Sequence, residues 1–347
     1  PLTQISAGLW TGSIFWLTPG QRYEVRVRFS DPDGVASPSV TASAVTRNDR
    51  WPVGSGRTIH VAVNGAGDGS SVSRPLGSVQ QAVDLAAPGD TVLIAPGVYR
   101  ESVVVGKSGT PNAYILIKGR PGAILDGSDA GFLDRDGPRR WTMRRFPPAG
   151  GTTGESRGNY FEADCDWPVD HIVIKGEKYY GSKTFADMQV CASGPPGCWY
   201  QDTPKQKLYV HPTRGWNSPG TQQTAVSRLA KGITLEDAHH VVVDGLEVRY
   251  FGKMGIDIRG SDNVVQNCLV RDQDVGININ GKEFHNNTIQ RCEVSQTSVY
   301  KWGWFHTKGT RYEVDNIAVR GGRGNVVRHN KVHGSFDGIG LSVWSHL

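Results

Sequence analysis

Charged and amide side chains recur at one place in a repeated segment of the chain. The segments Gly255-Ile-Asp-Ile, Gly276-Ile-Asn-Ile and Asn316-Ile-Ala-Val align, and polar residues follow their isoleucines at a constant spacing. Carboxylate, amide and guanidinium groups gathered in this way can bind a charged ligand and can hold or move protons. The residues concerned are Glu236, Asp257, Arg259, Asn278, Asn280 and Arg320.

The repeat that positions these side chains has a period near 22 residues. Equivalent residues are Ile233, Ile256, Ile277, Ile317 and Ile339, with steps of 23, 21, 40 and 22 residues. A period of this length with two or three short strands is typical of one coil of a β-solenoid. Because side chains alternate along a strand, each isoleucine should point inwards and the residue after it outwards. Two outward columns are expected: Thr234, Asp257, Asn278, Ala318 and Gly340, then Glu236, Arg259, Asn280, Arg320 and Ser342.

A second strand follows the first in each coil and predicts an internal ladder of small or amide side chains. Its members are Gly245, Cys268, Cys292 and Asn330. Coils stack about 4.8 Å apart, so Cys268 and Cys292 could bond, but we expect two reduced, buried thiols. A local disulfide is predicted between Cys191 and Cys198, which would suit an oxidising compartment.

The composition favours an all-β chain with many turns. Forty-four glycines and 19 prolines among 347 residues accompany abundant valine, isoleucine and threonine. The hydrophobic fraction of 37 % can build a sizeable core and excludes disorder for most of the chain. No stretch approaches the roughly 18 uncharged apolar residues of a membrane helix. The net charge of +5 is a mild preference for anionic partners, and it is too small to indicate nucleic-acid binding.

Residues 57–130 have a different pattern from the repeat. A strand at Thr58–Val63 precedes a helical segment at Ser78–Ala87 with Ser78 as its N-cap, and Pro88-Gly-Asp90 ends that helix before further strands. This order resembles the N-terminal cap of right-handed parallel β-helices in the pectate-lyase-like superfamily. The resemblance implies an all-β, right-handed parallel β-helix whose open end is plugged by the helix.

The other segments complete a five-part organisation. Residues 1–47 contain Leu17-Thr-Pro-Gly-Gln-Arg-Tyr23, which resembles the tyrosine corner of fibronectin type III modules, and they are too short for a whole module. A linker at 48–56, the cap at 57–130, an insertion with a small sheet at 131–226, and the coils at 227–347 follow. We expect the chain to begin inside the module and to end inside an unfinished solenoid, because no terminal capping unit is present.

The 40-residue step holds an excursion rich in aromatic and cationic residues: Trp302, Trp304, His306, Lys308 and Arg311. Indole rings stack on the apolar face of sugars, and cations pair with carboxylates or sulfates. The alternative is that the tryptophans anchor the loop on the solenoid.

Asp315 and Asp337 precede two repeat strands, where stacked carboxylates could hold Ca²⁺ or could be ordinary turn residues.

The resemblance to this superfamily implies a secreted or cell-surface protein that acts on an acidic polysaccharide. β-Elimination needs a base and a cation such as Ca²⁺ to stabilise the negative charge that develops. The candidate bases are Arg259, Arg320, His306 and Lys308. Asp257 could take part in holding that cation.

Two alternatives come from other function classes. A glycoside hydrolase would use a carboxylate pair, either Glu236 with Asp257 or Asp315 with Asp337. A glycan-binding or structural surface protein would use the same polar and aromatic side chains without any reaction, since the fold does not determine the function.

Overall fold

The structure is a computed structural model that describes residues 3–6, 9–11, 17–18, 20–30, 32–46, 50–132, 141–146, 158–191, 197–212, 224–296, 315–334 and 341–344. The chain divides into two compact units, Pro1–Pro52 and Val53–Leu347.

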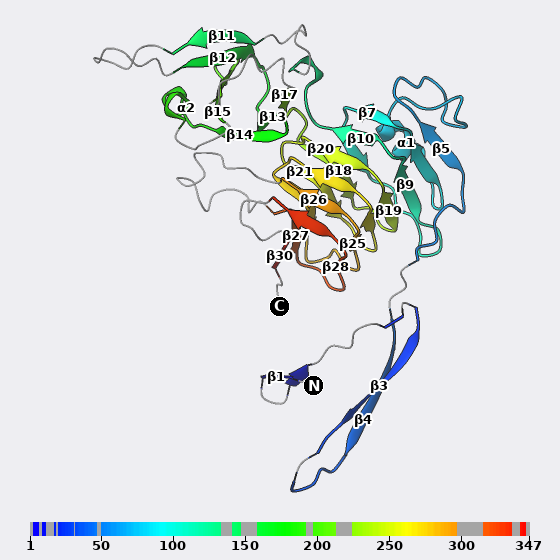
Figure 1. Cartoon of the computed structure of the whole chain (residues 1–347). Helices are drawn as coiled ribbons and strands as arrows, with labels where there is room; N and C mark the ends of the chain where they lie inside the picture. The colour runs from blue at the N-terminus through cyan, green and yellow to red at the C-terminus, as the bar shows by residue number, and fades with distance from the viewer. Residues whose placement is uncertain are drawn as a thin grey trace. The chain divides into compact units, whose positions relative to one another are not determined.

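The second unit is a parallel β-helix, as predicted, whose coils run through three parallel sheets (Figure 1). Sheet 1 contains β8 (Val103–Val105), β18 (Lys231–Glu236), β21 (Met254–Arg259), β24 (Val275–Asn280), β27 (Ile317–Arg320) and β30 (Leu341–Trp344). Sheet 2 contains β5 (Thr58–Val61), β6 (Thr91–Ile94), β9 (Ile115–Gly119), β19 (Val241–Asp244), β22 (Val264–Gln266), β25 (Thr288–Gln290) and β28 (Val326–Arg328). Sheet 3 contains β7 (Gly97–Tyr99), β10 (Ala123–Asp126), β20 (Glu247–Arg249), β23 (Leu269–Arg271), β26 (Glu293–Ser295) and β29 (Lys331–His333).

Aliphatic residues stacked between the sheets form the core of the solenoid. The repeat isoleucines Ile233, Ile256, Ile277 and Ile317 pair with one another in register and are fully buried, as the alternation predicts. Each coil therefore buries the same positions against the coil before it, which fixes the register because a one-residue slip would expose the isoleucines.

The predicted capping helix is α1 (Val79–Leu85). Ser78 is its N-cap and accepts a hydrogen bond from the backbone N–H of Gln81. The carboxylate of Glu101 accepts from the N–H groups of Val79 and Gln80, which satisfies donors that the first turn leaves open. Val79 and other apolar residues of this helix pack into the solenoid core.

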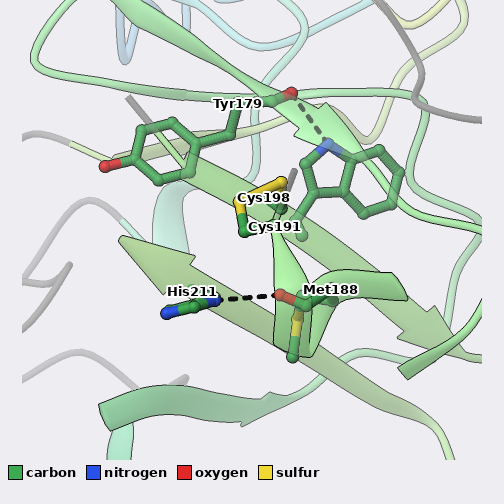
Figure 2. The surroundings of a disulfide bond; sticks show 6 residues. Tyr179, Met188, Cys191, Cys198 and His211 are labelled. Carbon is green, nitrogen blue, oxygen red and sulfur yellow. Dashed lines mark hydrogen bonds between the residues drawn. A yellow bond between two sulfur atoms is a disulfide. The ribbon is translucent and has the colours of Figure 1, made fainter. Parts of the chain in front are cut away.

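The predicted insertion folds as a separate, mostly antiparallel sheet. Its elements are η1 (Ala130–Phe132), β11 (Thr142–Arg145), β12 (Asn159–Asp164), β13 (Ile172–Ile174), β14 (Glu177–Gly181), α2 (Phe185–Val190), β15 (Gly197–Asp202), β16 (Lys207–Pro212) and β17 (Thr224–Val226). Within it, β15 and β16 form an antiparallel hairpin. The predicted Cys191–Cys198 disulfide is also present, with a Cα–Cα distance of 5.7 Å (Figure 2).

The internal ladder differs from the prediction by one residue at Gly245. Cys268 and Cys292 are free and buried, as predicted, and Asn330 follows them in register. In the preceding coil, Leu269 pairs with Glu247, so Cys268, the residue before Leu269, corresponds to Leu246, the residue before Glu247. Gly245 instead occupies the turn, where its φ of +74° is the left-handed conformation that glycine adopts without strain.

An asparagine ladder, which was not predicted, lies at the other end of the sheet 2 strands. The side chain of Asn263 accepts from the N–H of Val241 at 3.0 Å and donates to the carbonyl of Ala238 at 2.7 Å. Asn287 repeats the pattern against Asn263 and Gly260, and Asn325 repeats it in the next coil. These side chains satisfy buried backbone groups at the turns, which would otherwise cost free energy.

The first unit contains two antiparallel pairs, β1 (Thr3–Ser6) with β2 (Leu9–Thr11) and β3 (Arg22–Arg28) with β4 (Ser39–Val45). The Tyr23 hydroxyl accepts a hydrogen bond from the N–H of Thr18 at 2.8 Å, which is the local contact that the predicted corner requires. Assignment to a fibronectin type III module stays a prediction.

Helices α1 and α2 have seven and six residues. Neither is long enough to cross a membrane, and no other helix in the described part of the chain does so.

Candidate functional site

The predicted polar strip lies on the outer face of sheet 1. Register pairs Thr234 with Asp257, Asp257 with Asn278 and Asn278 with Ala318, so the first column is confirmed up to that coil. Glu236 pairs with Arg259 and, further along, Asn280 with Arg320 in the second column.

The prediction for the last coil was wrong by two residues. Leu341 pairs with Ile317, so Ser342 lies beside Ala318, in the column where Gly340 was expected. The step from Ile317 to Leu341 is 24 residues, longer than the period, because turns between strands accept extra residues without disturbing the sheet. Ile339 and Gly340 lie outside the described residues.

Asp257 is the centre of a buried polar cluster. Its side chain is only 1 % exposed, although its position on the strand faces outwards. It accepts hydrogen bonds from Lys231 Nζ at 2.6 Å, Arg259 Nε at 2.9 Å and Asn278 Nδ2 at 2.8 Å. Asp257 therefore faces outwards as predicted and is nevertheless buried, because the side chains that bind it also cover it.

Arg259 links Asp257 to the second column. Its Nη1 lies 3.3 Å from a carboxylate oxygen of Glu236, while its Nε binds Asp257. The pKa of Arg259 is raised above its usual value, chiefly by the Asp257 charge; partial burial lowers it by less, and the Glu236 charge raises it further. Arg259 therefore remains a cation at neutral pH, which favours a role in binding over its predicted role as a base.

These side chains line a hollow of about 450 Å³ on sheet 1. Its lining contains four carboxylates and one guanidinium, together with two amides and two large apolar side chains. The lining residues are Glu236, Asp237, Met254, Asp257, Arg259, Asn278, Asn280, Glu283 and Phe284. We call this the sheet 1 hollow.

Four of its lining residues were not predicted: Asp237, Met254, Glu283 and Phe284. Asp237 and Glu283 lie in the turns after β18 and β24, and alternation along a strand says nothing about turn residues. The signal that could have found them is their position just beyond the polar columns, since Asp237 directly follows Glu236 and Glu283 comes soon after Asn280.

Asn278 contributes an unused acceptor to the hollow. Its Nδ2 donates to Asp257, and its Oδ1 is buried without a hydrogen-bond partner among the residues that the structure describes. A buried acceptor without a donor is costly, so a ligand that supplies a hydroxyl or N–H at this point would be favoured.

Arg320 and Asp315, two further predicted residues that the structure describes, are not among the lining residues. Arg320 lies one strand beyond Asn280 and donates to Asp315 at 3.3 Å, so the predicted metal ligand Asp315 is already paired with a cation. Among the residues described, no group of three or more His, Cys, Asp or Glu side chains is placed to hold a metal. Trp302, Trp304, His306, Lys308, Arg311 and Asp337 lie outside the described residues.

Comparison with known proteins supports the fold. A family model described as a right handed beta helix region matches residues 231–346. The complex structure of XylC with xylose superposes with a TM-score of 0.57 at 13 % identity, covering 83 % of this chain and 60 % of that chain. The crystal structure of pectate lyase Pel9A gives 0.45 at 16 %, covering 81 % and 48 %. The structure described as a rhamnogalacturonan lyase gives 0.43 at 11 %, covering 84 % and 63 %.

No curated protein matches the sequence. The chain spans less than two thirds of each of these three structures, and at such low identity the likeness concerns the fold alone. By its fold, the second unit of this chain is a right-handed parallel β-helix.

Proposed function

We propose that this protein is a carbohydrate-active β-helix protein that binds a glycan in the sheet 1 hollow and cleaves it there with carboxyl groups. The observation that carries the proposal is the lining, in which four carboxylates surround one guanidinium on a regular sheet. Met254 and Phe284 add apolar surface beside these charges. Sugar rings have an apolar C–H face and polar hydroxyls, so a mixed surface of this kind suits them.

Glu236 and Glu283 are the carboxylates that we assign to the reaction. Both are exposed, whereas Asp257 is buried under its ion pairs. Glu236 ends β18 and Glu283 follows β24, so the strand of Arg259 lies between theirs. Both carboxyl groups line the same hollow, so one can serve as the general acid and the other as the general base of hydrolysis.

β-Elimination from an acidic polysaccharide is the second candidate. Arg259, Asn280 and Arg320 follow one column, so an acidic chain lying across the strands would meet two guanidinium groups. His306 is the base that we would then test first, because Arg259 is held protonated by its carboxylate partners. The excess of carboxylates in the hollow favours hydrolysis, because they repel an anionic chain.

The calcium prediction gains no support from the described residues. One oxygen of Asp315, Oδ2, lies 3.3 Å from Nη2 of Arg320, so a cation of the protein already pairs with this carboxylate. The test below therefore includes chelation by EDTA as one of its arms.

We also propose that the protein acts outside the cell or at its surface. The Cys191–Cys198 disulfide supports this, because disulfides persist in oxidising compartments.

The test is a panel of neutral and acidic polysaccharides, with and without EDTA. Released reducing ends report cleavage by either reaction, and ultraviolet absorbance of an unsaturated uronate reports elimination. We expect new reducing ends without ultraviolet absorbance, released at a rate that EDTA does not change. Glu236→Gln and Glu283→Gln should each lower the rate by about 10²–10⁴-fold, the usual contribution of a general acid or base. Glu177→Gln is the matched control, since Glu177 is an exposed glutamate on β14 outside the hollow.

The possible outcomes separate the three function classes. Absorbance that depends on His306 would replace hydrolysis with elimination. Binding without any product would leave a glycan-binding protein. Full activity in both glutamine variants would contradict the assignment of the site.

A further inference from the structure

A second hollow lies where the insertion leaves the solenoid and returns to it. The chain departs after β10 and returns before β18, and Ser128 and Ser227 form a β-bridge between the two crossings. The hollow measures about 610 Å³ and is lined by Arg100, Ser128, Asp129, Ala130, Gly131, Asp164, Arg228 and Leu229. None of these residues lines the sheet 1 hollow, so the two are separate. We call this the junction hollow.

Arg228 is held in place with part of its guanidinium still open. Its Nη1 donates to Asp129 Oδ2 at 2.6 Å, and its guanidinium carbon lies 4.9 Å from the centre of the Trp167 ring. Trp167 is itself fixed, because its Nε1 donates to the carbonyl of Ser227 at 2.9 Å. The Arg228 side chain is nevertheless 53 % exposed. A guanidinium ordered in this way has lost its freedom before binding, so it can bind an oxyanion at a low entropic cost.

The carboxylates of the junction hollow are already engaged. Asp129 binds Arg228 through one oxygen and accepts from the N–H of Gly131 at 2.8 Å through the other. Asp164 pairs with Lys207 Nζ at 2.6 Å. Arg100 is exposed, and no ion pair joins it to any residue in the described part of the chain. The charge left without a counter-ion is therefore positive.

We propose that the junction hollow binds an acidic sugar by its carboxylate, through Arg228 and Arg100. A guanidinium presents parallel N–H groups that match the two oxygens of a carboxylate. The volume falls within the roughly 300–1,000 Å³ of small-molecule sites, which leaves room for the sugar ring next to Ser128. A carboxylate-bearing sugar would thus be recognised away from the acidic sheet 1 hollow. The proposal does not depend on any cleavage there.

The experiment titrates the whole protein with a linear trimer of galacturonic acid, the neutral galactose trimer and sodium sulfate, by calorimetry. We expect the acidic trimer to bind and the neutral one not to bind. Arg100→Gln and Arg228→Gln should each weaken binding about tenfold or more, because each removes charge-assisted hydrogen bonds. Arg228→Lys keeps the charge but not the paired donors, and it should recover only part of the affinity.

Arg144→Gln is the matched control. Arg144 is also paired with a carboxylate, Glu162, and its side chain is 52 % exposed, but it does not line the junction hollow. Equal binding by wild type and by the double variant Arg100→Gln/Arg228→Gln, with unchanged melting temperature, would overturn the proposal. So would sulfate binding as tightly as the acidic trimer, which would indicate an adventitious ion site. Glycan cleavage measured on the same variants separates this proposal from the one for the sheet 1 hollow.

Discussion

Replacing Asp257 by asparagine tests whether the buried cluster of the sheet 1 hollow is an electrostatic anchor. The substitution keeps the shape of the side chain and removes its charge. Lys231 Nζ at 2.6 Å and Arg259 Nε at 2.9 Å both bind the same oxygen, Oδ2, so both ion pairs weaken together. Asn278 can turn its amide and offer its unused Oδ1 to the new N–H₂ group, so that contact is retained.

The expected loss in the free energy of unfolding follows from these contacts. A hydrogen bond to a charged group contributes about 1.5–3 kcal/mol. Breaking a fully buried pair costs about 3–5 kcal/mol. Lys231 and Arg259 are partly exposed and can be hydrated again once their partner is neutral. We therefore expect Asp257→Asn to destabilise the protein by about 2–3 kcal/mol.

Equilibrium unfolding in urea, followed by circular dichroism, measures this loss. The control is Asp237→Asn in the same hollow, whose side chain is 96 % exposed and whose substitution should change stability by less than about 0.5 kcal/mol. If Asp257→Asn also stays within about 0.5 kcal/mol of wild type, the cluster is not an anchor and the reasoning fails.

Three further predictions concern the ladder, the disulfide and a buried histidine. Asn287→Ala leaves the N–H of Asn263 and the carbonyl of Gly260 without partners and should cost about 2–4 kcal/mol, read from the urea midpoint; a midpoint like that of wild type would contradict a structural ladder. Replacing Cys191 and Cys198 by serine opens a loop with a sequence separation of 7 and should cost about 2.5 kcal/mol, measured as a lower melting temperature that reductant no longer changes. Burial lowers the pKa of His211, and its contact with the Met188 carbonyl raises that pKa by a smaller amount (Figure 2). Just below the usual histidine pKa of about 6.5, the folded protein therefore binds fewer protons than the unfolded chain. The free energy of unfolding should thus be highest above about pH 6.5 and should fall as the pH drops below that value. His211→Gln should flatten this dependence in melting curves between about pH 5 and 7.5, and an equal pH slope in both proteins would refute the prediction.

Periodicity was sufficient to predict the register of most of sheet 1. In a parallel β-helix each coil pairs with an equivalent copy of itself, so a residue spacing in the sequence becomes a position on the sheet. Ile233, Ile256, Ile277 and Ile317 therefore stack as predicted, and the polar columns follow from them. Helix α1 was predictable for a similar reason, because its N-cap and apolar spacing are local.

The turns were the part that periodicity could not place. Gly245 was assigned to the ladder and lies in the turn beside it, because a shift of one residue exchanges an inward position for a turn position. The last coil is longer than the period, so its pairing moved by two residues. Turn length carries no alternation signal, and the asparagine ladder at the other turn was missed for the same reason.

The sequence by itself determined the solenoid, its core positions, the capping helix, the disulfide and the strip around Asp257 and Arg259. Only the tertiary structure decided that Asp257 is buried, that Glu283 joins the sheet 1 hollow from a turn, and that Arg100 and Arg228 line one hollow at the junction. The physical reason is the range of the interactions. Alternation and spacing record contacts within a strand or between equivalent coils, whereas the crossing at Ser128 and Ser227 brings together segments that share no repeat.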